Sequence, residues 1–168
     1  MRISLLLLLL NEFMNNQELI EKFYLESTKD IKDEWFVSEI LHWYSYIINL
    51  PQHLQITYLT VLLESQVFNG GFHQYFANGY GQFAKETIYS LIEIGAFKKS
   101  NLLEKAFNLI KDEKLSDEEF RKELLDKTLK KLFFEDDLYD PLQELDDIYY
   151  DIEDENIEDL LGDYLRKV

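Results

Sequence analysis

Apolar residues recur at intervals of three and four positions along nearly the whole chain. The spacing is clear at two places, in Leu19, Ile20, Phe23 and Tyr24 and in Trp35, Phe36, Ile40, Trp43, Tyr44 and Ile47. A helix returns to the same face after three or four residues, whereas a strand alternates at every second residue. Strand-like alternation is absent, so the pattern predicts an all-α protein.

Proline, glycine and polar capping residues divide this pattern into segments. Pro51 stands where a helix would begin, Gly95 follows a helical stretch, and Ser116 with Glu119 has the spacing of a capping box. We expect about eight or nine helices, over residues 16–27, 33–48, 51–68, 72–77, 82–94, 98–112, 117–133, 141–152 and 156–166. No long linker interrupts the series, and 168 residues suit one core. The chain is predicted to form a single compact domain over residues 15–168.

Residues 1–14 form an apolar leader whose role is open. Leu5 to Leu10 follow one positive charge, as in a signal peptide, but Asn11-Glu12-Phe13 offers no small-residue cleavage site. The apolar run is also far shorter than the roughly 20 residues that span a bilayer. Met14, which is followed by a polar lead into a helix, is an alternative start of translation. We expect a cytoplasmic protein that does not enter a membrane.

The chain is strongly acidic, and its charged residues are unevenly distributed. The chain carries a net charge of −16. Residues 1–100 have 11 acids against 7 bases, a net of −4, and residues 101–168 have 22 against 10, a net of −12. Residues 135–163 contain 14 acids and no base. Such charge opposes direct binding to nucleic acid or anionic membranes and favours a basic protein as partner.

Candidate catalytic and metal-binding chemistry is sparse. Cysteine is absent, which excludes disulfides, thiolate catalysis and zinc sites of the Cys type. His42, His53 and His73 are scattered and form no metal-ligand motif. We therefore predict no catalytic residue, no metal site and no cofactor, and we do not expect an enzyme. The remaining enzyme hypothesis places a pocket near Glu64, His73 and Tyr75.

The acidic segment also keeps the apolar spacing of buried helix faces, so its carboxylates should project from helices anchored to the core. Asp140, Glu144, Asp147 and Asp151 share one helix face. Their axial steps are about 4.5 to 6 Å, the same order as the roughly 3.4 Å between charges on each strand of B-DNA. The alternative is that these acids only keep the protein soluble. The predicted partner-binding surface consists of Glu135, Asp136, Asp137, Asp140, Glu144, Asp147, Asp151, Asp154 and Glu158.

The most distinctive stretch, residues 64–79, predicts a tight turn between helices. Gly70 or Gly71 can adopt the left-handed conformation that ends the preceding helix. Glu64 could accept amide protons across the turn, and Asn69 and Asn78 could bond to neighbouring backbone groups. The aromatic residues of the stretch are expected in the core. We interpret this signature as structural, and its residues are Glu64, Asn69, Gly70, Gly71, Phe72, Gln74, Tyr75, Phe76 and Asn78.

This stretch resembles the signature of a bacterial DNA-mimic protein family, a domain family of formerly unknown function. The similarity extends over about residues 33–168 and includes Ile94-Gly95-Ala96, Leu145-Asp146-Asp147-Ile148-Tyr149-Tyr150 and Tyr164-Leu165-Arg166. The resemblance implies an all-α fold and an acidic dimer that imitates duplex DNA, so a homodimer is suggested here. We therefore predict a module that occupies the DNA-binding surface of a transcription factor or nucleoid protein. The alternative is an immunity or antitoxin-like protein that neutralises a specific toxin.

Overall fold

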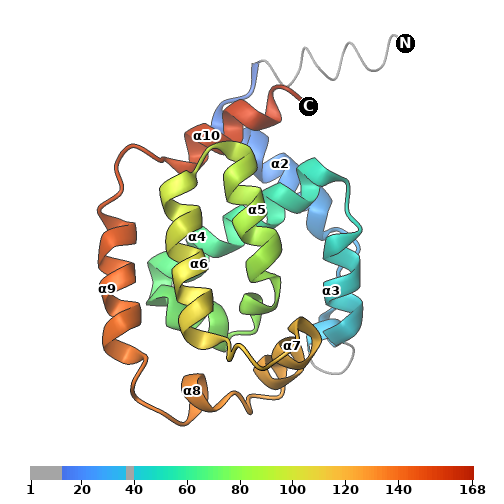
Figure 1. Ribbon diagram of the computed structural model, residues 1–168. Coiled ribbons are helices and arrows are strands. Elements are labelled where there is room, and N and C mark those ends of the chain that lie inside the picture. The colour runs from blue at the N-terminus through green and yellow to red at the C-terminus, as the bar shows by residue number, and fades with distance from the viewer. Residues whose placement is uncertain (1–12, 37–39) are drawn as a thin grey trace.

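Helices make up the regular structure of the chain in the computed structural model, which describes residues 13–36 and 40–168 (Figure 1). The elements in order are α2 (Asn16–Thr28), the 3-10 helix η1 (Asp33–Phe36), α3 (Ile40–Ile48), α4 (Gln52–Ala77), the 3-10 helix η2 (Tyr80–Phe83), α5 (Ala84–Ile94), α6 (Phe97–Ile110), α7 (Asp117–Leu125), α8 (Lys130–Phe133), α9 (Tyr139–Tyr150) and α10 (Ile157–Leu165). The described residues form no strand, so the all-α prediction is confirmed. Residues 1–12 of the predicted leader lie outside the described part.

The long helix α4 is the centre of the arrangement. Helices α2, α5 and α9 and the 3-10 helix η2 all pack against it, and α6 pairs with α5. Figure 1 shows α9 at the outer edge of the molecule, on the far side of α6 from α5, while α10 lies beside α2 near the two ends of the chain. Among the described helices, none is long and apolar enough to cross a bilayer.

Two groups of buried side chains stabilise this arrangement. The larger contains Phe72, Tyr75 and Phe76, as predicted, together with side chains from α2, α5, α6, α9 and α10. The smaller surrounds Trp43 of α3, whose indole N–H donates to the Tyr58 hydroxyl at 3.0 Å. Aromatic rings dominate the second group, and their edge-to-face contacts add specificity to the apolar burial.

The helix starts follow the capping signals of the sequence. Ser116 accepts from the Glu119 amide and the Glu119 side chain accepts from the Ser116 amide, so the predicted capping box is confirmed. Asn15 and Glu18 form a second capping box at the start of α2. Each cap satisfies amides that the first turn leaves unbonded, and such a cap contributes about 1 kcal/mol.

The predicted single helix over residues 117–133 is wrong. Helix α7 ends at Leu125, and Lys127 adopts a left-handed conformation with φ of +57°. The amide of Thr128 donates to the Glu123 carbonyl at 2.9 Å, and the Lys127 amide donates to the Leu124 carbonyl at 3.3 Å. These bonds form a Schellman motif, in which glycine is the usual residue at the left-handed position. A lysine at that position gave no sign of a helix end.

Other helix boundaries differ by less. The predicted break at the glycine pair is confirmed, because Gly70 and Gly71 have non-helical backbone angles and divide α4 into two helical parts at a kink. The segment predicted as a helix over 33–48 contains η1 and then α3, with residues 37–39 outside the described part. Helix α9 begins at Tyr139, so Pro141 lies in its first turn, where a missing amide leaves no bond unmade.

Candidate protein-interaction site

The glycine turn, which consists of Gly70 and Gly71, kinks α4 and is hydrogen-bonded to α9. Gly71 has φ of +71°, in the region that favours glycine, whereas Gly70 is extended. The turn exposes the first amide of the second part of α4, and this amide, from Phe72, donates to Oδ1 of Asp146 at 2.8 Å. A Cβ atom on Gly71 would lie 2.1 Å from the other oxygen of Asp146. The prediction that Glu64 accepts amide protons at this turn is therefore wrong, because Asp146 of α9 is the acceptor.

The polar side chains of the turn bond mainly to each other. Oε1 of Gln66 accepts from Gln74 at 3.1 Å and from Asn78 at 2.9 Å. The Asn69 amide donates to Oε1 of Gln74 at 3.2 Å. Asn69 and Asn78 thus bond through their side chains to other side chains, whereas the sequence predicted bonds to the backbone. The network links the two parts of α4 across the kink.

Glu64 belongs to a buried polar cluster between α4, α6 and α9. Its Oε1 accepts from Nζ of Lys99 at 2.9 Å and from the hydroxyl of Tyr149. The side chain of Lys99 is only 4% exposed, and its Nζ lies 4.5 Å from the centroid of the Tyr149 ring. Burial, and then the charge of Glu64, raises the pKa of the Tyr149 hydroxyl well above its ordinary value. The cluster is an internally paired unit that stabilises three helices.

The enzyme hypothesis named Glu64, His73 and Tyr75 as pocket residues. Tyr75 is buried and its hydroxyl bonds to Thr87 at 3.1 Å, while His73 is exposed and lines a cavity beside α8. No hydrogen bond joins the three side chains. Within residues 13–36 and 40–168, no three side chains of His, Asp or Glu are placed to hold a metal ion.

Two carboxylates of the acidic segment are buried and accept backbone amides. Glu155 accepts from the amides of Lys98 at 2.8 Å and Lys99 at 3.0 Å, at the start of α6. Its negative charge also lies at the positive end of the α6 helix dipole. Asp146 has the equivalent role at the glycine turn, and burial is the main cause that raises the pKa of its carboxyl group. These two acids stabilise the fold and are not available to a partner.

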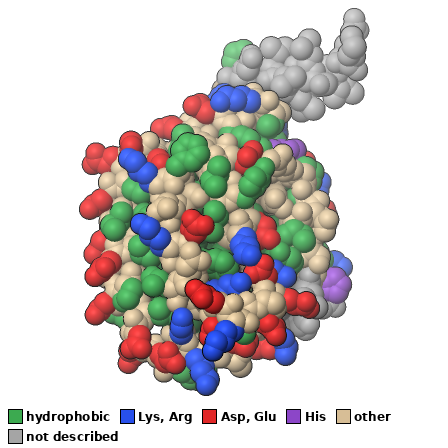
Figure 2. All heavy atoms as spheres, viewed as in Figure 1, with side chains coloured by type: hydrophobic (Ala, Val, Ile, Leu, Met, Phe, Trp, Pro, Cys, Tyr) green, Lys and Arg blue, Asp and Glu red, His purple; other side chains and the backbone are tan. Residues whose placement is uncertain are grey.

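The remaining acids of residues 135–163 are exposed. All nine residues of the predicted partner-binding surface are among them: Glu135, Asp136, Asp137, Asp140, Glu144, Asp147, Asp151, Asp154 and Glu158. In Figure 2 acidic side chains line the edge of the molecule where Figure 1 places α9.

Four of these acids form what we call the acidic stripe: Asp140, Glu144, Asp147 and Asp151. They lie on α9 and its C-cap, opposite the buried side chains of Leu142, Leu145 and Tyr149. Asp154 pairs with Lys98. In contrast, no Lys or Arg among the described residues pairs with a member of the stripe. The charge of the stripe is therefore open to solvent and to a partner.

Exposed aromatic side chains next to the stripe had no predicted role. Phe68 of α4 and Tyr150 of α9 have ring centroids 5.4 Å apart. Tyr150 directly precedes a stripe residue, Asp151, and Phe68 lies two positions before Gly70. The helical period alone does not show that these two rings meet, because they are 82 positions apart in the sequence.

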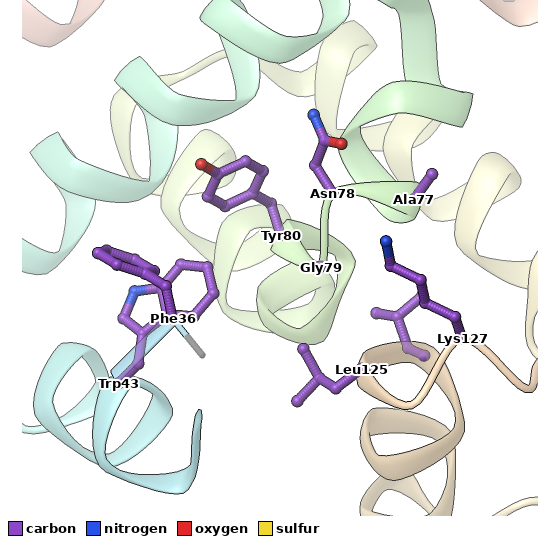
Figure 3. Close-up of a pocket in the computed structure, with 9 residues that line it drawn as sticks. Phe36, Trp43, Ala77, Asn78, Gly79, Tyr80, Leu125 and Lys127 are labelled. Atoms are coloured by element: carbon purple, nitrogen blue, oxygen red, sulfur yellow. The ribbon is translucent and has the colours of Figure 1, made fainter. Parts of the chain in front are cut away.

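A cavity of about 390 Å³ lies at the C-terminal end of α4, and the sequence did not predict it (Figure 3). Figure 3 shows Phe36, Trp43 and Tyr80 on one side of it and Leu125 and Lys127 on the other. No acidic residue lines this cavity. It is therefore chemically distinct from the acidic stripe.

Comparison with models of protein families identifies the family of the chain. The model of the family described as DMP19-like protein matches residues 48–168, which include the glycine turn, the buried cluster and the acidic segment. Searches of curated proteins and of solved structures found no match.

Proposed function

Because the chain belongs to the DMP19-like protein family, a family of DNA mimics, we propose that it binds a basic DNA-binding protein in place of DNA. The acidic stripe of α9 occupies the surface with which that partner, a transcription factor or nucleoid protein, contacts phosphates. The observation that carries the proposal is the set of four exposed carboxylates without a basic partner among the described residues.

The spacing of the stripe supports this role. Helix geometry places successive members about 4.5 to 6 Å apart along the axis. Phosphates on one strand of B-DNA follow each other at roughly 3.4 Å along the axis. A groove that holds several Lys and Arg side chains for phosphates can therefore meet several carboxylates of one rigid helix. Phosphate contacts position a protein on DNA without reading bases, so the mimic needs no base-like groups.

Rigidity supports the proposal as well. The inner face of α9 is fixed by Asp146 at the glycine turn and by Tyr149 in the buried cluster. The carboxylates of the outer face are thus presented without ordering a flexible segment on binding. Ordering a segment would oppose association, so a preformed row of charge binds more tightly than an acidic tail of equal charge.

Capture of partners from a cell extract tests the proposal. The tagged full chain is incubated at low salt, and bound proteins are eluted with rising salt or with excess duplex DNA. We expect a DNA-binding protein that DNA displaces. A tight partner that DNA does not displace would overturn mimicry in favour of the immunity-type function.

A fourfold variant tests the face itself. Asp140→Asn, Glu144→Gln, Asp147→Asn and Asp151→Asn together should weaken binding of the captured partner by on the order of tenfold or more, since exposed ion pairs contribute about 0.2 to 1 kcal/mol each. The charge-matched control changes four exposed acids elsewhere, Glu21, Glu26, Glu104 and Glu113, to Gln. Equal loss in both variants would mean that net charge matters and the stripe does not.

A further inference from the structure

Two rings form an exposed aromatic pair at the flank of the acidic stripe. Phe68 is 58% exposed and Tyr150 is 40% exposed. The Tyr150 hydroxyl donates to the carbonyl of Val67 at 2.7 Å, which holds the ring beside Phe68. Exposed aromatic groups in fixed positions are typical anchors of protein interfaces, because little side-chain entropy is lost when they are covered.

Negative charge adjoins the aromatic pair. Asp147 precedes Tyr150 by three positions in α9, a spacing that brings two side chains to the same side of a helix. The Asp147 carboxylate accepts a hydrogen bond from the Gln143 side chain and pairs with no described cation. Nζ of Lys99 lies 5.7 Å from the centroid of the Phe68 ring, whereas no Lys or Arg among the described residues lies over the Tyr150 ring or pairs with Asp147. A further cation at Tyr150 and Asp147 would have to come from a partner.

The protein already contains completed versions of this arrangement. Nζ of Lys99 lies over the Tyr149 ring and bonds to Glu64. The guanidinium carbon of Arg121 lies 4.4 Å from the centroid of the Tyr44 ring, and its NH1 donates to the hydroxyl of that ring at 3.4 Å. In both cases an aromatic face and an oxygen acceptor hold one cation. The aromatic pair with Asp147 offers the same two elements on the surface.

We propose that the aromatic pair and Asp147 bind an arginine side chain of the partner protein. This inference rests on the proposed function and specifies how the partner is recognised. A guanidinium can stack flat on a ring while its edge donates to a carboxylate, whereas the ammonium of lysine is a compact, strongly hydrated charge. A second copy of this chain is a poor occupant, because its own acidic stripe would face like charge. Duplex DNA exposes no such ring pair, so the mimic gains a contact that DNA lacks.

Arginine and lysine peptides of equal charge test the proposal. Hexa-arginine and hexa-lysine are titrated into the full chain at low salt by calorimetry, and the ratio of their affinities is measured. Phe68→Leu should lower the arginine preference by about two- to five-fold, the size of an exposed cation–π contact. Phe68→Tyr keeps a ring and should retain the preference.

Phe97→Leu is the matched control. Phe97 is 62% exposed on α6 and is followed by Lys98 and Lys99, so cations and not carboxylates adjoin it in the sequence. Its loss should leave the arginine preference unchanged. The proposal is overturned if Phe68→Leu leaves the preference unchanged, or if Phe97→Leu lowers it as much. Failure of DNA to displace the captured partner would overturn the mimicry alone, because the peptide ratio does not depend on DNA.

Discussion

Asp146 and Asp147 are consecutive residues of α9, but they lie on different faces of the helix and have different environments. Asp146 is buried and accepts the Phe72 amide, whereas Asp147 is exposed with the rest of the acidic stripe. The same division separates buried Glu155 from its exposed neighbour Asp154. The charge of the last third of the chain is therefore not one property. Asp146 and Glu155 accept hydrogen bonds from backbone amides inside the fold, and the other carboxylates are exposed at its surface.

The inner face of α9 packs against the buried cluster of Glu64, Lys99 and Tyr149. The largest loss of stability should therefore come from breaking the ion pair in this cluster. Lys99→Met leaves the Glu64 carboxylate without its cation, and we expect a loss of about 3 kcal/mol in the free energy of unfolding, the lower end for a broken buried pair. The lower end applies because the Glu64 side chain remains 23% exposed. Urea denaturation followed by circular dichroism measures the change.

The adjacent lysine provides the control for that experiment. Lys98 pairs with Asp154 on the surface, with both side chains more than half exposed. Lys98→Met should change stability by only about 0 to 1 kcal/mol, as is usual for surface ion pairs. Similar losses in the two variants would show that the buried ion pair contributes no more to stability than the exposed one.

Breaking the glycine turn should cause a loss of stability of a size comparable to that of Lys99→Met. Gly71→Ala places a methyl group against the Asp146 carboxylate and also strains a backbone with φ of +71° and ψ of −175°, a region that is essentially limited to glycine. The strained backbone costs about 1 to 3 kcal/mol, and displacing Asp146 leaves a buried amide unbonded, for about 1 to 3 kcal/mol more. We expect a loss of at least about 2 kcal/mol in urea denaturation.

Gly95→Ala is the control for strain at a positive φ without any contact to displace. Gly95 also has a positive φ, of +89°, but a Cβ atom there would meet nothing within 4 Å. This variant should lose only a backbone contribution of about 1 to 2 kcal/mol, because Gly95 is in the αL conformation. If both alanine variants lose the same amount, the bond between Asp146 and the turn contributes little.

These contacts explain why the sequence predicted the fold better than the site. Helical periodicity is a local signal, and it predicted most helices. The spacing of Ser116 and Glu119 is also local, and it predicted the capping box. The burial of Asp146 depends on an amide 74 residues away, and that of Glu155 on amides 56 and 57 residues away. One local signal existed, because Asp146 follows Leu142 by four positions and precedes Tyr149 by three, which places it on the buried face. The meeting of Phe68 with Tyr150 had no local signal.

The smallest expected change in stability comes from single substitutions in the acidic stripe, and it tests whether the exposed face of α9 contributes to stability. Asp151 caps the C-terminal end of α9, where negative charge opposes the helix dipole, whereas Asp140 lies in the first turn, where it is favourable. Asp151→Asn should therefore raise the free energy of unfolding by about 0.3 to 1 kcal/mol, and Asp140→Asn should lower it by a similar amount. Both changes remove one charge and relieve repulsion within the stripe, so the difference between the variants reports the dipole.

Binding should not follow stability in this pair. Each substitution removes one carboxylate from the acidic stripe, so both should weaken binding of the captured partner. Only Asp140→Asn should also lower the free energy of unfolding. An acid that destabilises its own helix but strengthens binding is retained for the partner and not for the fold. If Asp151→Asn stabilises the protein and leaves binding unchanged, then the stripe ends before Asp151, and the contact with the partner lies nearer the start of α9.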